Sequence, residues 1–157
     1  MNGSQKGFTL LELVVVLLII TLIMAVSYPT LSRGTAALSL RTTGRDILNT
    51  FRYAREKAVT LQSGMLVTVD RENQKLRLTD DFGEGNREYL LPDNVRIDRV
   101  LLGGSETGQS SIIVRFLPNG SSDTVEILLQ SRNGSLLKVV SDPISGGACI
   151  RPGEEAL

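Results

Sequence analysis

Apolar residues form an almost unbroken stretch near the start of the chain. It covers the 19 residues 8–26, and Glu12 is its only charged member. As a helix it is about 28 Å long at roughly 1.5 Å per residue, close to the hydrocarbon thickness of a bilayer. Many of its residues are β-branched, but lipid forces backbone groups to pair within the segment. We therefore expect a membrane-spanning helix.

The pattern then changes to that of an amphipathic helix. Pro29 follows the apolar stretch, where its ring and missing N–H predict a kink, and Gly34 and Gly44 are further weak points. Beyond them apolar residues recur at steps of three and four, while charged residues occupy the other faces. The apolar set is Ile47, Phe51, Ala54, Ala58 and Leu61. Gly64 is expected to end the helix as a left-handed cap residue.

After Gly64 the apolar residues alternate or form short runs, which predicts six or seven antiparallel strands. Asn133-Gly134 is the strongest hairpin signal, and Pro118-Asn119-Gly120 predicts another turn. The expected strands are 65–70, 75–79, 87–91, 95–102, 111–117, 124–130 and 135–141. A helix followed by strands indicates an α+β fold, with an antiparallel sheet packed on the C-terminal half of the helix.

Composition narrows the possible functions. The 157 residues suffice for one domain plus an appended segment, and 17 basic residues balance 17 acidic ones, so no global field attracts nucleic acid or anionic lipid. Histidine is absent and Cys149 is the single cysteine, which excludes an internal disulfide and the familiar zinc spacings. No catalytic triad or phosphate-binding loop is recognisable. We expect no enzyme, cofactor or metal site; the role of Cys149 is open.

Glu12 is the most unusual residue of the apolar stretch. A central acid costs roughly 2.5 to 3.5 kcal/mol on insertion, and less near the interface. A charged α-amino group at Phe8 would lie about one helical turn from this carboxylate, so the amine of one subunit could meet Glu12 of a neighbour in low dielectric. Such a pair would also fix the stagger between subunits.

The residues around Glu12 resemble the prepilin peptidase site of type IV pilins and type II secretion pseudopilins. The run reads Lys6-Gly7-Phe8-Thr9-Leu10-Leu11-Glu12-Leu13. The resemblance implies cleavage between Gly7 and Phe8, N-methylation of Phe8, and a single-pass inner-membrane protein with a periplasmic C-terminal domain. It also implies three partners: other pilins or pseudopilins in a filament, the prepilin peptidase and the inner-membrane assembly platform.

The soluble part is most similar to the GspH/FimT group of pilin-like proteins. The similarity rests on the helix end 51–60 and on Phe116-Leu117-Pro118-Asn119-Gly120. The expected organisation is a leader (1–7), a transmembrane and assembly helix (8–28), the soluble half of that helix (29–64) and a periplasmic β-rich domain (65–157). The implied function is that of a minor pseudopilin that assists export of folded proteins by type II secretion.

Three alternatives stay open. The chain could be a FimT-like minor pilin that primes a type IV pilus or takes up DNA through its basic helix residues, although interspersed acids and an acidic tail argue against nucleic acid. Those basic residues are Arg41, Arg45, Arg52, Arg55 and Lys57. It could be an ordinary secreted β-rich domain cleaved after Ala25-Val26-Ser27. The loop with Asp80, Asp81 and Glu84 could offer oxygens to calcium, but it lacks EF-hand spacing.

Overall fold

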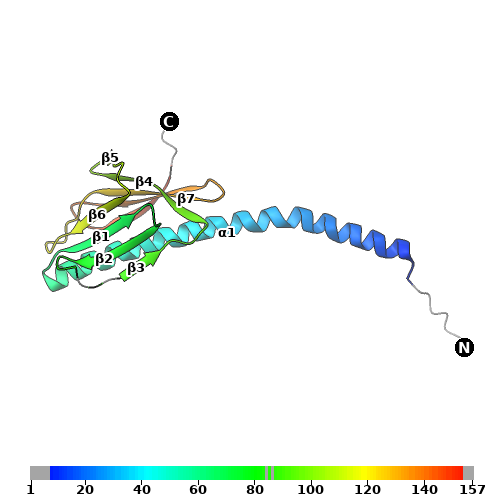
Figure 1. Ribbon diagram of the computed structural model, residues 1–157, viewed down its shortest axis with the longest axis horizontal. Helices are drawn as coiled ribbons and strands as arrows, with labels where there is room; N and C mark the ends of the chain where they lie inside the picture. The colour runs from blue at the N-terminus through cyan, green and yellow to red at the C-terminus, as the bar shows by residue number, and fades with distance from the viewer. Residues whose placement is uncertain (1–7, 84, 86, 154–157) are drawn as a thin grey trace, which may run out of the picture. The chain divides into compact units, whose positions relative to one another are not determined.

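The computed structural model describes residues 8–83, 85 and 87–153, and the side chains of 25–34 are outside this description. Helix α1 (Leu10–Leu61) comes first, and nine strands follow it in the described part of the chain (Figure 1). The chain divides into two compact units, one ending at Thr35 and the other beginning at Ala36. The expected order of helix and strands is confirmed.

The nine strands form two sheets rather than the single sheet expected. The first sheet has the order β3-β2-β1-β6, and the second β5-β4-β7-β8-β9, with every pair antiparallel. The strands of the first sheet are β1 (Met65–Asp70), β2 (Lys75–Asp80), β3 (Arg87–Leu90) and β6 (Ser111–Phe116). Those of the second are β4 (Val95–Leu102), β5 (Ser105–Glu106), β7 (Val125–Ser131), β8 (Leu136–Ser141) and β9 (Ala148–Pro152).

Seven strands coincide with the predicted segments to within one residue at each end, while β5 and β9 were not expected. The two predicted turns are confirmed. Gly134 has φ 87° and its N–H donates to the Ser131 carbonyl (2.9 Å), which closes the hairpin between β7 and β8. Gly120 has φ 86° and its N–H donates to Leu117 (2.9 Å). Both glycines adopt a left-handed conformation that costs other residues energy.

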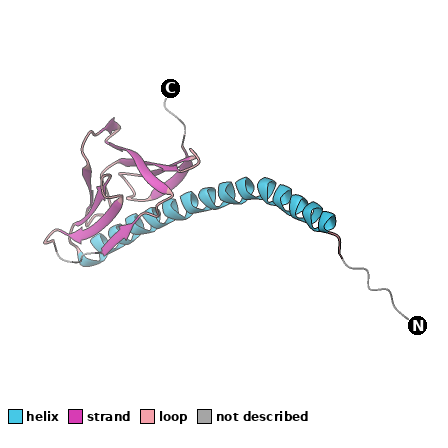
Figure 2. Cartoon of the chain, turned by 45° about the vertical axis from the view of Figure 1, so that its right-hand side comes forward, coloured by secondary structure: helices cyan, strands magenta, loops and turns pink. Residues whose placement is uncertain are grey.

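The core lies between α1 and the two sheets. Ile47, Phe51, Ala54 and Ala58 are fully buried, as their helical spacing predicts. Phe51 meets Phe116 of β6 with ring centroids 5.5 Å apart and an interplanar angle of 55°, a favourable tilted arrangement. Leu61 departs from the prediction, because it is 57% exposed at the last turn of the helix. Figure 2 shows the strands arranged along the C-terminal part of α1.

Gly44 is a packing position rather than the weak point expected. A Cβ atom there would lie 2.7 Å from Leu137 Cδ2 of β8, closer than real Cβ contacts allow. The helix therefore approaches β8 closely because this residue has no side chain. α1 is also unbroken through Pro29 and Gly34. The bend of the axis expected at Pro29 stays a prediction.

The helix end differs from the sequence interpretation. Gln62 (φ 51°), rather than Gly64, is the left-handed residue, and the Ser63 N–H donates to the Ala58 carbonyl (3.3 Å). This is the long-range bond of a Schellman motif. Gly64 serves another purpose: its N–H donates to Asp81 Oδ2 (2.9 Å), and a Cβ would lie 2.3 Å from that oxygen. A side chain at position 64 would displace the Asp81 carboxylate from this bond.

Candidate functional site

Thr9 precedes the first residue of α1, and its side chain contacts the backbone of Glu12, the charged residue of the apolar stretch. The Glu12 N–H lies 3.2 Å from Thr9 Oγ1 and 3.1 Å from the Thr9 carbonyl, which also accepts from the Leu13 N–H (3.3 Å). Thr9 is therefore the N-cap of α1, and Glu12 is the third residue of its first turn. Thr-x-x-Glu at these positions is the sequence of a capping box. Glu12 is thus held in the first turn, where the helix dipole favours a negative charge.

The cleavage and assembly residues are only partly described. Phe8 is 86% exposed and precedes the N-cap, and Glu12 is also exposed. Within the described residues the Glu12 carboxylate has no ion-pair partner. Gly7 lies outside the described residues. Cleavage after Gly7, methylation of Phe8 and charge pairing through Glu12 therefore remain predictions.

The first part of α1 carries an apolar surface without a protein core beneath it. From Phe8 to Met24, fourteen large hydrophobic side chains are exposed by 42% to 86%. All core residues of the described chain lie at or after Ala36. A contiguous apolar surface of this kind marks a site of contact with lipid or protein. Taken over the described residues, no helix combines the length and the apolar character needed to span a membrane.

Comparison with known proteins bears on both parts of the chain. Residues 2–28 match the family described as prokaryotic N-terminal methylation motif. Two solved structures of the minor pseudopilin EpsH from the type II secretion system of Vibrio cholerae are similar in fold, with TM-scores of 0.58 and 0.59. They cover 73% and 75% of this chain and 97% of their own, at 11% and 12% identity. No curated protein matches the sequence.

The chain has the fold of a minor pseudopilin. Its N-terminal motif is the signal of type IV pilin-like proteins, so two independent parts of the chain agree. The α+β class expected from the sequence, a long N-terminal helix packed on antiparallel strands, is confirmed. At 11% to 12% identity the likeness establishes the fold.

Four of the five basic residues proposed for DNA binding fall on one side of α1, because Arg41, Arg45, Arg52 and Arg55 are spaced by four, seven and three residues along the helix. Arg41 and Arg45 line a groove with β8 and β9, whereas Arg52 and Arg55 line a hollow beside Gly146. Arg55 Nε donates to the Gly120 carbonyl (3.1 Å), so part of its bonding capacity serves the fold. Lys57 Nζ lies 5.8 Å from the centre of the Tyr53 ring. The alignment of the four arginines does not distinguish a solvated helix face from a phosphate-binding one, so DNA binding stays an untested alternative.

The acidic loop proposed for calcium has a structural use. Asp81 Oδ2 accepts from Gly64 and Asp80 Oδ1 accepts from the Phe82 N–H (3.1 Å). Glu84 lies outside the described residues. Among the residues that the structure describes, no three carboxylate, histidine or cysteine side chains gather as a metal site would require.

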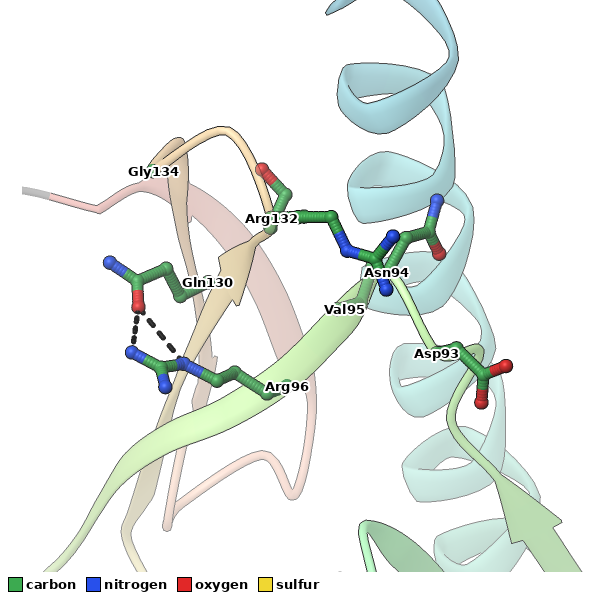
Figure 3. Close-up of a pocket in the computed structure, with 8 residues that line it drawn as sticks. Asp93, Asn94, Val95, Arg96, Gln130, Arg132 and Gly134 are labelled. Atoms are coloured by element: carbon green, nitrogen blue, oxygen red, sulfur yellow. Dashed lines mark hydrogen bonds between the residues drawn. The ribbon is translucent and has the colours of Figure 1, made fainter. Parts of the chain in front are cut away.

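A polar hollow of about 370 Å³ lies between the start of β4 and the end of β7 with the turn that follows it (Figure 3). Arg96 Nε donates to Gln130 Oε1 (3.0 Å), so these two side chains of its polar lining satisfy each other. The Arg132 N–H donates to the Asn94 carbonyl (2.9 Å) and holds the rim. These contacts connect strands, and the charged groups do not converge on one point as in a catalytic centre.

Two further residues were missed in the sequence. Thr9 could have been identified, because Thr-x-x-Glu before an apolar run is the signal of a capped helix start. Tyr89 of β3 could not, because its Oη donates to Asp46 Oδ2 (2.8 Å) on α1, 43 residues away in sequence. This bond fastens an edge strand to the helix. Burial and the neighbouring Asp46 carboxylate raise the pKa of Tyr89 to about 12.

Proposed function

We propose that this chain is a minor pseudopilin of the GspH type in a type II secretion pseudopilus, where it assists export of folded proteins. The observation that carries the proposal is the pairing of a methylation motif at residues 2–28 with a soluble fold like that of EpsH. The EpsH likeness favours secretion over a FimT-like role in a type IV pilus, which stays the alternative.

In this proposal the chain is inserted in the inner membrane by residues 8–28, with its β-rich domain in the periplasm. The prepilin peptidase removes residues 1–7 and methylates Phe8. The exposed apolar side chains from Phe8 to Met24 contact lipid first and other pseudopilins later, since the helix has no core of its own to cover them. The assembly platform draws the subunit out of the bilayer into the filament.

Glu12 then forms the charge pair that sets the stagger between subunits. The N-cap at Thr9 fixes the first turn, so the carboxylate is presented at a defined position on the helix. The α-amino group of an incoming subunit neutralises it, and a shifted subunit would leave a buried charge unpaired at a cost of about 3 to 5 kcal/mol. The methylation motif and the capped geometry support this role.

The test separates charge from helix capping. Glu12→Gln keeps a side chain that can complete the capping box but removes the charge, whereas Thr9→Ala removes the cap at a cost of about 1 kcal/mol. We expect Glu12→Gln, Glu12→Ala and Glu12→Lys to be cleaved after Gly7 normally and to reduce filament incorporation more than 100-fold, while Thr9→Ala reduces it about tenfold or less. Cross-linking into filaments and mass spectrometry of the mature N-terminus measure the two steps.

Wild-type incorporation of Glu12→Gln would refute the charge pair. A mature protein that begins at Tyr28 would refute the pseudopilin proposal itself, because a signal peptidase would then have removed the whole apolar stretch. A mature N-terminus at N-methylated Phe8 supports it.

A further inference from the structure

Two turns of the second compact unit carry the same three residues, Asn-Gly-Ser. They are 119–121, between β6 and β7, and 133–135, between β7 and β8. In an Asn-Gly pair the side-chain amide carbon of the asparagine lies near the backbone nitrogen of a residue that has no Cβ to hinder approach. That nitrogen can attack the amide carbon and displace ammonia. Both turns are therefore candidate sites of a chemical modification that needs only water.

The hydrogen bonds within the two turns are closely matched. Each glycine N–H donates to the carbonyl three residues earlier at 2.9 Å, and each glycine is left-handed, with φ of 86° at Gly120 and 87° at Gly134. Each asparagine Oδ1 accepts from the N–H of the serine two residues later, at 3.0 and 3.2 Å. Each also accepts from a serine hydroxyl, that of Ser121 or Ser131. Local geometry therefore does not distinguish the reactivity of the two turns.

Contacts from the rest of the domain clamp the first turn. Arg55 of α1 donates through Nε to the Gly120 carbonyl (3.1 Å), and a Cβ at Gly146 would lie 2.2 Å from the same oxygen. Gly120 is buried. Ring closure needs the peptide between Asn119 and Gly120 to rotate, which would break the bond to the charged arginine and displace the neighbouring loop.

The second turn has no such clamp among the described residues. Gly134 is exposed, and a Cβ there would have no neighbouring atom within 4 Å. The hydrogen bonds of Asn133 and Gly134 all stay within residues 131–135. Opening of this tip breaks only those bonds, so it costs less free energy than opening of the clamped turn.

We infer that Asn133 loses its side-chain amide spontaneously, whereas Arg55 protects Asn119 from the same reaction. Hydroxide removes the Gly134 N–H proton, and the nitrogen electron pair forms a bond to Cγ of Asn133. The bond from Cγ to Nδ2 then breaks, and ammonia leaves with a proton taken from water. A further water adds to either carbonyl of the resulting cyclic imide and breaks its bond to nitrogen, which leaves an aspartate or an isoaspartate.

The products alter the hairpin between β7 and β8. Both carry a carboxylate in the turn that borders the polar hollow lined by Arg96 and Arg132. The isoaspartate also lengthens the backbone at the tip, where the Ser131 N–H donates to the Ser135 carbonyl (2.9 Å). Because loop length sets the register of a hairpin, accumulation of isoaspartate loosens this pair of strands with time.

Ageing of the full chain in detergent at mildly alkaline pH tests the inference. Peptide mass spectrometry follows the gain in mass at each turn, and labelling by protein isoaspartate methyltransferase identifies the isoaspartate. Asn119 is the internal control, because it has the same following residues and the same local bonds. We expect Asn133 to convert about tenfold faster or more, the factor that corresponds to a hydrogen bond with a charged donor. In urea, which removes the clamp, the two should convert at similar rates.

Removal of the arginine tests the protection directly. Arg55→Ala should raise the rate at Asn119 toward that at Asn133, because Gly120 loses its charged donor. Arg52→Ala is the matched control, since Arg52 is also exposed on α1 and makes no hydrogen bond to the turn within the described residues. It should leave both rates unchanged. General loosening of the fold would raise both rates, so the ratio of the two rates isolates the clamp.

Three results would overturn the inference. They are equal rates at the two asparagines in the folded chain, conversion of Asn133 in urea but not in the folded chain, and a ratio of rates that Arg55→Ala leaves unchanged. The reaction involves neither Glu12 nor assembly with other subunits. Its failure would therefore leave the proposed function untouched.

Discussion

At the scale of single residues, Tyr89 couples the edge of the first sheet to the helix. Its Oη donates to Asp46 at 2.8 Å, and burial followed by the Asp46 contact raises the pKa of Tyr89 from 10.0 to about 12. The neutral phenol is thus the form that the folded state prefers. A phenolate would be partly desolvated and would face a carboxylate, so ionisation weakens the fold.

The raised pKa of Tyr89 predicts a loss of stability at alkaline pH. A group whose pKa is higher in the folded state contributes its full stabilisation below the unfolded value of 10 and loses it as the pH rises toward 12. Tyr89→Phe should lower the free energy of unfolding by about 1 to 2 kcal/mol at pH 8 and reduce the further decline between pH 10 and 12. Urea unfolding at several pH values measures both effects.

Tyr53→Phe is the control for that titration, since Tyr53 lies on the surface of α1 beside Lys57 and Arg87. It should retain the wild-type decline between pH 10 and 12. If Tyr89→Phe and the wild type lose stability identically between pH 10 and 12, the contact between Tyr89 and Asp46 does not cause that loss.

Residue-scale prediction from the sequence succeeded where the cause is local. The hairpin at Asn133-Gly134 was predicted because Asn-Gly is a local turn signal, whereas the role of Glu12, a charge in an apolar stretch, stays a prediction. Gly64 was expected to be the left-handed cap of the helix, which is wrong; its N–H instead bonds to the carboxylate of Asp81, seventeen residues away. A contact of that range has no signature in the local pattern.

At the scale of elements, the end of α1 carries a conformational cost. Gln62 has φ 51°, a left-handed conformation that costs an L-residue roughly 1 to 2 kcal/mol. Its side chain recovers part of this by donating to the Val59 carbonyl (2.8 Å). Glycine is the usual residue at this position of a Schellman motif.

Gln62→Gly should therefore stabilise the chain, by about 0.5 to 1 kcal/mol, in thermal or urea unfolding. Gln74 is the matched control: it has φ 50°, but its side chain donates to the Arg71 carbonyl (2.5 Å) and accepts from the Ile97 N–H (2.6 Å). Gln74→Gly should destabilise by about 1 to 3 kcal/mol, because it removes both bonds. Equal changes in stability for the two substitutions would mean that backbone strain alone determines the effect.

Among the strands, the pattern of apolar residues predicts some and misses others. Alternation identified β1 and β6 because one face of each is buried, as in the pattern of Met65, Val67 and Val69. β9 was missed because most of Ala148–Pro152 is exposed and no alternation of apolar residues exists to detect. The division into two sheets was missed as well, since β1 pairs with β6 and β4 with β7 across long intervals of sequence.

At the scale of the whole molecule, the two compact units differ in what holds them. The unit from Ala36 onward contains all buried hydrophobic residues of the described chain, including Phe51, Phe116 and Ile127. The first unit contributes an exposed apolar helix surface and no core residue within its described part.

A chain that begins at Ala36 should consequently fold by itself. Deleting residues 1–35 removes no described core residue, so we expect a cooperative thermal transition within about 5 °C of that of the full chain in detergent, with the near-ultraviolet signal of packed aromatic rings retained. Phe51→Ala in the same truncated chain is the control, because loss of a fully buried aromatic costs about 3 to 5 kcal/mol and should shift the transition strongly downward. A truncated chain that unfolds without a transition would show that residues before Ala36 stabilise the domain through contacts that burial does not reveal. Retention of the fold would instead leave the N-terminal helix free to exchange lipid for neighbouring subunits without unfolding the domain it carries.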